Sequence, residues 1–179
     1  RATSGKISLH RVPVDLAALV ARGMETFQPQ AAKLGIAISS APPPTPLTVL
    51  GDPVRLEQVL ANLVGNALKY TPRGGNVALA LEREGGEVVL SVRDDGVGIA
   101  PDQLHRVFDT FVQVETTLDR SLGGLGLRLT LAKSLVSMHG GTIEASNMPI
   151  GGAVFRFTLP LAGEPPLVES QWAATARAA

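Results

Sequence analysis

Two amide side chains and one ammonium group stand at helical spacing between Asn62 and Tyr70. Asn62, Asn66 and Lys69 are four and three residues apart, so a helix would carry them on one face. An amide oxygen is the kind of ligand that Mg²⁺ accepts beside its waters, and an ammonium group suits phosphate. These three residues alone leave open a second interpretation, the solvated face of an amphipathic helix.

Two glycine-containing segments follow this stretch. The first, DDGVGI at residues 94–99, begins with Asp94, whose carboxylate could accept a hydrogen bond from the exocyclic amine of adenine. Glycine lets a backbone approach a base closely, although Asp and Gly also dominate ordinary turns. The second, GGLGL at residues 123–127, precedes a helical pattern whose first N–H groups would attract phosphate oxygens. A flexible hinge is the alternative for this second segment.

Several other functions are disfavoured. A dinucleotide fingerprint needs a third glycine where Leu129 stands, and no Walker phosphate loop occurs. Lys+Arg and Asp+Glu are both 16 in 179 residues, so no basic excess indicates nucleic acid. There is no cysteine, and no apolar run approaches the roughly 20 residues that span a bilayer. We therefore expect no nucleic-acid partner and no membrane contact from this part of the protein.

Apolar residues recur at helical spacing in three long segments. They predict helices over residues 14–28, over residues 52–70, and from Gly124 or Gly126 to about Met138. Pro13 suits the first turn of the first helix, and Asp52 followed by Pro53 is a helix start. A shorter helix is expected over residues 101–108, and the polar residues 109–123 predict a flexible lid.

Strand patterns separate these helices, and Glu84-Gly85-Gly86 indicates a hairpin. Strands are expected near residues 33–40, 47–50, 76–81, 87–93, 142–146 and 153–159. This order predicts an α/β sandwich, in which about three helices cover one face of a mixed, mainly antiparallel sheet of about five strands. The main domain should span residues 12–160, between the end of an upstream element (residues 1–11) and a tail or linker (residues 161–179).

The three motifs, in this order and on these elements, resemble the ATP-binding catalytic domain of sensor histidine kinases, of the GHKL superfamily and Bergerat fold. The words DPVRLEQVLANLVGNALKYTP, VFDTFVQVE and MHGGTIEASN carry the resemblance over roughly residues 12–160. SGKISL resembles the end of the dimerising helical hairpin that precedes this domain in such kinases. VFDTFVQVE also resembles hybrid sensor kinases.

The resemblance implies ATP and Mg²⁺ as ligands and assigns a role to each matching residue. Asn66 would coordinate the metal, Asn62 and Lys69 would contact phosphates, Tyr70 would lie against the nucleotide, and Asp94 would bind the adenine amine. The remaining matches shape the pocket, anchor its lid or bound the triphosphate side: Gly96, Gly98, Ile99, Phe108, Phe111, Gly124, Leu125, Gly126 and Leu127.

The position of Asn62 indicates where the phosphate goes. ATPases of the superfamily carry there a Glu that activates water, and an Asn side chain cannot act as a general base. The resemblance therefore implies transfer to a His on the upstream hairpin and then to a response regulator receiver domain. His10, His105 and His139 are interpreted as structural or surface residues. Glu57, in the same helix as Asn66, is a weaker catalytic candidate.

The full protein is expected to be a homodimer with its kinase domain in the cytoplasm, and the sequence leaves open a membrane anchor elsewhere in the full protein. One residue departs from the family pattern as we align it: Arg128 stands at the third place of the second glycine box. Its side chain would either crowd the phosphates or bind them. Two alternatives therefore remain, a nucleotide-binding pseudokinase and an anti-sigma Ser/Thr kinase, although SGKISL argues against the second.

Overall fold

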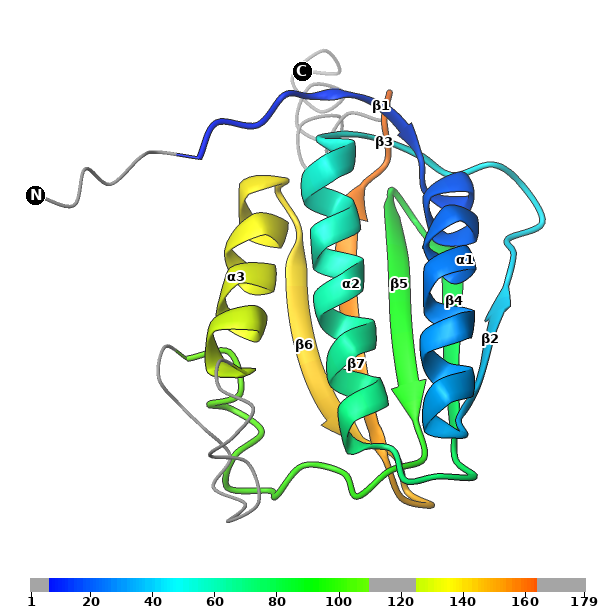
Figure 1. The fold of residues 1–179 in the computed structure, drawn as a ribbon. Helices are drawn as coiled ribbons and strands as arrows, with labels where there is room; N and C mark the ends of the chain where they lie inside the picture. The colour runs from blue at the N-terminus through cyan, green and yellow to red at the C-terminus, as the bar shows by residue number, and fades with distance from the viewer. Residues whose placement is uncertain (1–6, 110–124, 164–179) are drawn as a thin grey trace, which may run out of the picture.

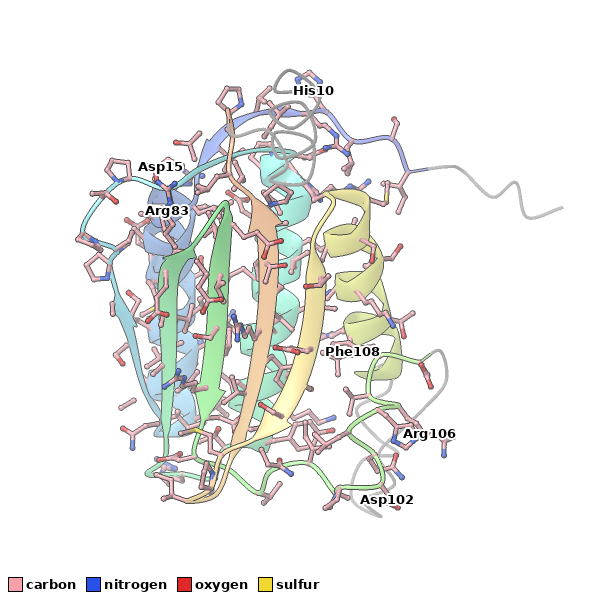
Figure 2. The ribbon with its side chains drawn as sticks, turned by 180° about the vertical axis from the view of Figure 1, so that it is seen from behind. His10, Asp15, Arg83, Asp102, Arg106 and Phe108 are labelled. Carbon is pink, nitrogen blue, oxygen red and sulfur yellow. The ribbon has the colours of Figure 1, made fainter. Side chains whose placement is uncertain are left out.

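The computed structural model describes the backbone of residues 7–109 and 125–163, and the side chains of residues 7–109 and 128–163. A five-stranded sheet carries three helices on one face (Figure 1). Figure 2 shows the other face, over which no described helix lies. The helices are α1 (Leu16–Leu34), α2 (Pro53–Tyr70) and α3 (Leu125–Met138). This is the predicted α/β sandwich.

The sheet is mixed, as expected, with the strand order β2-β4-β5-β7-β6. Only the β2–β4 pair is parallel, and the other three pairs are antiparallel. Its strands are β2 (Ala37–Ala41), β4 (Asn76–Glu84), β5 (Glu87–Asp94), β6 (Thr142–Asn147) and β7 (Ala153–Pro160). A separate antiparallel pair joins β1 (Val12–Asp15) to β3 (Thr48–Gly51).

The core lies between the sheet and the helices. One side of α2 is buried against the sheet. The residues of β7 alternate between buried and partly exposed, and the buried ones form its inward side. Each Leu or Val removed from water contributes about 1.5–3 kcal/mol. Buried residues of these two elements include Val59, Leu63, Val64, Ala67, Ala153, Phe155, Phe157 and Leu159.

The start of α2 is the one that the sequence predicts. Asp52 is the N-cap, and its Oδ1 accepts hydrogen bonds from the backbone of Val54 at 3.1 Å and Arg55 at 3.3 Å. The start of α1 differs from the prediction. Its N-cap is Asp15, and Pro13 belongs to strand β1, so the proline does not open the helix.

One further expectation is wrong. The segment at residues 101–108 is a series of turns, because its backbone bonds join residues three apart: Gln103 to Ala100, and Arg106 to Gln103. The strand expected within residues 33–40 is present as β2, and it begins at Ala37 because α1 continues to Leu34. The expected lid lies almost wholly outside the described residues, as do residues 1–6 of the lead-in and 164–179 of the tail.

The sandwich has two functionally different ends. The C-terminal end of α2, the C-terminal end of β5 and the N-terminal end of α3 meet at one of them (Figure 1). The β1–β3 pair lies at the other. In the described part of the chain, no helix is both long and apolar enough to cross a membrane.

Candidate nucleotide-binding site

Asp94, the last residue of β5, is a buried carboxylate at the end of the sheet where the motifs meet. Its exposed fraction is 4 %, and its Oδ1 accepts hydrogen bonds from the backbone of Gly96 at 3.0 Å and Ala153 at 3.3 Å. Oδ2 accepts no hydrogen bond from a described residue. Burial raises the pKa of the Asp94 carboxyl above its ordinary value, against the opposing effect of these two N–H groups. One oxygen is thus fixed and the other remains an acceptor for a ligand.

The first glycine of the DDGVGI segment permits a close approach between two backbones. A Cβ on Gly96 would lie 2.3 Å from the carbonyl oxygen of Tyr70 and 3.0 Å from Asp94 Oδ1. A side chain here would therefore push the end of α2 away from the loop. This contact brings Tyr70 and Asp94 to the same site, as the family resemblance predicts.

Asn147 holds the second half of that loop, a role that the sequence did not indicate. Its Oδ1 accepts from the backbone N–H of Ile99 at 2.8 Å, and its Nδ2 donates to the Ile99 carbonyl at 2.6 Å. Gly98 has φ 74°, a conformation that favours glycine, and a Cβ there would lie 3.0 Å from Asn147 Oδ1. The side-chain amide of Asn147, the last residue of β6, thus bonds the backbone of Ile99 as the backbone of a neighbouring strand would.

Asp95 is exposed, and it ties the loop to the start of β4. Its carboxylate accepts hydrogen bonds from the backbone N–H of Asn76 at 2.7 Å and from Asn76 Nδ2 at 3.0 Å. Both hydrogen bonds lower the pKa of the Asp95 carboxyl, and the bond from the Asn76 backbone has the larger effect. The two neighbouring carboxylates therefore have separate tasks, because only Asp94 is buried and keeps an oxygen for a ligand.

The polar face of α2 carries the predicted amide and ammonium groups. Asn66 is 5 % exposed, and its side chain makes no hydrogen bond with the described part of the chain. The Nζ of Lys69 lies 5.7 Å from the centre of the Tyr70 ring. Asn62 Nδ2 donates to the carbonyl of Arg128 at 3.0 Å, so this amide also joins α2 to the first turn of α3.

Phe108 fixes the far side of the site, where the chain leaves the loop toward α3 (Figure 2). Its ring packs edge-on against Phe155 of β7 at 6.1 Å between centroids, and its carbonyl accepts from Thr130 Oγ1 at 3.0 Å. Phe111, Gly123 and Gly124 lie outside the described residues, and so do the side chains of 125–127. The structure places the backbone of Leu125, Gly126 and Leu127 at the start of α3.

Glu57 does not lie with the residues of the site. It forms an ion pair with Arg22 of α1, with 3.4 Å between Oε1 and Nη2, and both side chains are more than half exposed. Nine residues separate it from Asn66, which is about 13 Å along a helix. Glu57 therefore lies apart from the residues of the site.

The three histidines lie outside the site as well. His10 and His105 are exposed. His139 is buried at 3 %, and its Nε2 accepts a hydrogen bond from the backbone N–H of Asp52 at 3.0 Å. Its Nδ1 lies 2.7 Å from the Leu135 carbonyl, so the ring is neutral with its proton on Nδ1. His139 is a structural residue, as the sequence analysis expected.

A profile of the histidine kinase-, DNA gyrase B- and HSP90-like ATPases matches residues 51–163, which contain every described residue of the site. The chain belongs to this family. The sensor-like histidine kinase SenX3 of Mycobacterium tuberculosis is 41 % identical over 117 residues, which cover 65 % of this chain and 28 % of SenX3. The chain therefore spans under a third of that relative's length. Within the family it is a histidine kinase catalytic domain.

Solved structures agree with this assignment. Full-length ShkA in complex with AMPPNP has a TM-score of 0.76 at 36 % identity, covering 89 % of this chain and 33 % of ShkA. The histidine kinase ThkA in complex with the response regulator TrrA has a TM-score of 0.71 at 27 % identity, covering 85 % and 42 %. Membership of an ATPase family supports ATP as the nucleotide of this domain.

Proposed function

We propose that this domain binds ATP with Mg²⁺ and transfers the γ-phosphate to a histidine on an upstream helical hairpin, for relay to a response regulator. The observation that carries the proposal is the state of Asp94. Main-chain N–H groups hold its Oδ1, and no described residue donates to Oδ2, which leaves that oxygen to an amine donor. A buried acceptor of this kind suits the exocyclic amine of adenine.

The residues present fit Mg²⁺ as an accompanying ion. Asn66 offers an amide oxygen without a hydrogen-bond partner in the described structure. The described residues contain no group of three or more His, Cys, Asp or Glu side chains that could hold a metal. This donor set suits Mg²⁺, which keeps several waters and commonly takes one or two protein ligands together with phosphate oxygens. When bound, the ion would supply charge neutralisation at the phosphates.

The residues of the site position the nucleotide more than they activate a nucleophile. Asn62 has no basic group, and its Nδ2 is engaged with α3. Water activation would need a general base, and the described side chains of this α2 face supply none. Lys69 would neutralise phosphate charge, and Tyr70 would lie beside the nucleotide. Phosphoryl transfer to an incoming side chain depends mainly on positioning and charge, which these residues provide.

Similar proteins support the acceptor and the partner. SenX3 is a sensor-like histidine kinase, and the ThkA structure contains a response regulator. By likeness, we infer a His-bearing dimerisation hairpin upstream of this domain, a receiver domain as the next acceptor, and a homodimeric full protein. The lead-in that ends at residue 11 is where that hairpin would join.

Incubating the full-length protein with ATP labelled at the γ-phosphate tests this proposal. We expect protein-bound label that is stable in base and lost in acid, as a phosphoramidate bond requires. The label should disappear when the hairpin histidine is replaced by Gln, and it should move to the receiver domain when that is added. Release of inorganic phosphate without any labelled protein would contradict the proposal and indicate hydrolysis instead.

A further inference from the structure

Arg128 lies in the first turn of α3, and its guanidinium lies against α2 beside a glycine. A Cβ placed on Gly65 would be 3.4 Å from Arg128 Nη1, which is van der Waals contact. Arg128 is exposed, and it forms no ion pair with a described residue. A side chain longer than that of alanine at position 65 would therefore compete with the guanidinium for this space.

This is an unfavourable place for a cation that has no ion-pair partner among the described residues. The N-terminal end of a helix carries partial positive charge, so an arginine in the first turn is repelled by the helix dipole. Lys69 follows Gly65 by four residues and lies on the same face of α2. An anionic ligand at this end would remove the penalty on Arg128.

The first turn of α3 is also fixed in position. Asn62 Nδ2 donates to the carbonyl of Arg128 itself, at 3.0 Å. Asn62, Gly65 and Lys69 share one face of α2, and Asn66, the proposed metal ligand, follows Gly65 directly. The backbone of Arg128 is therefore held next to the residues that would contact a nucleotide phosphate.

We infer that Arg128 is a phosphate-binding residue of this site and that Gly65 provides the opening in which its guanidinium lies. The inference rests on the proposed function and deepens it. A guanidinium can donate two parallel hydrogen bonds to phosphate oxygens, which an ammonium cannot do. The residue would therefore make the site favour nucleotides with β- and γ-phosphates over monophosphates. The sequence left open that the Arg128 side chain crowds the phosphates. Because the side chain lies against α2, the structure disfavours that alternative.

Calorimetric titration of Arg128→Ala and Arg128→Lys with ATP, ADP and AMP tests the inference. For Arg128→Ala we expect affinity for ATP and ADP to fall by about tenfold or more, as for loss of one charge-assisted contact. Affinity for AMP should be unchanged, and Arg128→Lys should recover only part of the loss. Lys133→Ala removes an exposed cation from the same helix and should change none of these affinities.

Thermal unfolding of the nucleotide-free variants separates binding from stability. Because Arg128 is repelled by its own helix end, Arg128→Ala should melt at the same temperature as the wild type or higher. A purely structural role would instead lower the melting temperature, and that result would overturn the inference.

The Gly65 part has its own test. Gly65→Met would fill the space with a good helix former, so the helix should persist while the guanidinium is displaced. We expect weaker ATP binding in the wild-type background and no further weakening in Arg128→Ala. Ala61→Met, at an exposed position of α2, is the matched control. Equal losses in both backgrounds would show that Gly65 does not act through Arg128.

Failures of the two proposals are distinguishable. If the wild type binds ATP and Arg128→Ala binds it equally or more tightly, this inference is wrong and the proposed function stands. If the wild type binds none of the three nucleotides, both are wrong.

Discussion

At the scale of single residues, the site depends on side chains whose atoms have divided tasks. Asp94 uses one oxygen to join Gly96 to Ala153, residues 57 positions apart in the chain, and keeps the other for a ligand. Burial of this carboxyl disfavours its charged form, so the folded domain carries a cost that ligand binding can offset.

Asp94→Asn should separate binding from stability. The amide oxygen can still accept from Gly96 and Ala153, but an NH₂ group then faces the adenine amine, donor against donor. We expect ATP affinity to fall by about tenfold or more, measured by calorimetry. Asp95→Asn, on the exposed neighbour, should change ATP affinity much less. Equal affinity in wild type and Asp94→Asn would refute the adenine assignment.

The same variant has an expected pH dependence. Folding raises the pKa of Asp94, so the wild type loses this group's contribution to stability as pH rises through that raised value. Asn does not titrate, so Asp94→Asn should equal or exceed the wild type in urea unfolding at neutral pH. That difference should shrink as pH falls through the raised pKa and should be gone below the ordinary pKa of aspartate. A difference that grows in acid would mean that burial does not dominate.

Asn66→Ala should abolish the benefit of Mg²⁺. It removes an amide oxygen that no described residue uses, so the fold should lose little stability. We expect ATP affinity without Mg²⁺ to be nearly unchanged and the increase on adding Mg²⁺ to be lost, in paired titrations. Gln58→Ala in the same helix is the control. A full Mg²⁺ response in Asn66→Ala would assign the ion to other ligands.

At the scale of elements, the fold was more predictable than the contacts between loops. The Asp52-Pro53 start of α2 was readable because cap and proline act within three residues. The wrong start of α1 at Pro13 has a physical reason, since pairing of Pro13 in β1 with Leu50 in β3, 37 residues away, decides that boundary. The composition of residues 101–108 resembled a helix start, but the segment forms turns. Local composition does not distinguish these two structures.

The hold of Asn147 on the loop was not predictable, because it depends on where β6 ends beside a segment 48 residues earlier. A terminal Asn after a strand is ordinarily a turn residue. The shared face of Asn62, Asn66 and Lys69, by contrast, followed from helical spacing. The family resemblance was needed to assign a role to Asp94. Periodicity fixes which residues share a face, whereas sheet order decides which loops meet.

Asn147→Ala should loosen the loop at residues 96–99 without unfolding the domain. Two hydrogen bonds to Ile99 are lost, each worth about 0.5–1.5 kcal/mol when made. We expect weaker ATP binding together with faster amide hydrogen exchange at Ile99. Ser146→Ala, the exposed neighbour, should leave both unchanged. Normal protection at Ile99 in Asn147→Ala would show that other contacts hold the loop.

At the scale of the whole molecule, the end opposite the nucleotide site joins the lead-in, which ends at residue 11, to helices α2 and α3. The backbone of His10 donates to Asp52 Oδ2 at 3.0 Å, and Arg11 Nη2 donates to the Met138 carbonyl at 2.6 Å. Figure 2 shows His10 and Asp102 at opposite ends of the sandwich. His139 completes this junction by accepting from the Asp52 backbone. The segment that would lead from the hairpin is thus bonded to the start of α2 and the end of α3.

His139→Ala should destabilise the domain by about 1–3 kcal/mol, the cost of leaving a buried backbone donor unsatisfied. Urea unfolding measures the loss. His105→Ala, on an exposed histidine, should stay within about 0.5 kcal/mol of wild type. The assignment of His139 as a structural residue fails if the two variants lose the same amount.

The position of β7 inside the sheet, between β5 and β6, has a consequence for synthesis of the chain. β5 is complete at Asp94, yet the strand that pairs with its second edge begins 59 residues later at Ala153. At about 5–20 residues per second, the ribosome leaves that edge without its partner for roughly 3–12 s. The unpaired edge belongs to a strand that carries the apolar side chains Val88, Leu90 and Val92, and such an edge can pair with other nascent chains. Chaperone demand should therefore peak after Asp94 emerges and fall once β7 is inserted.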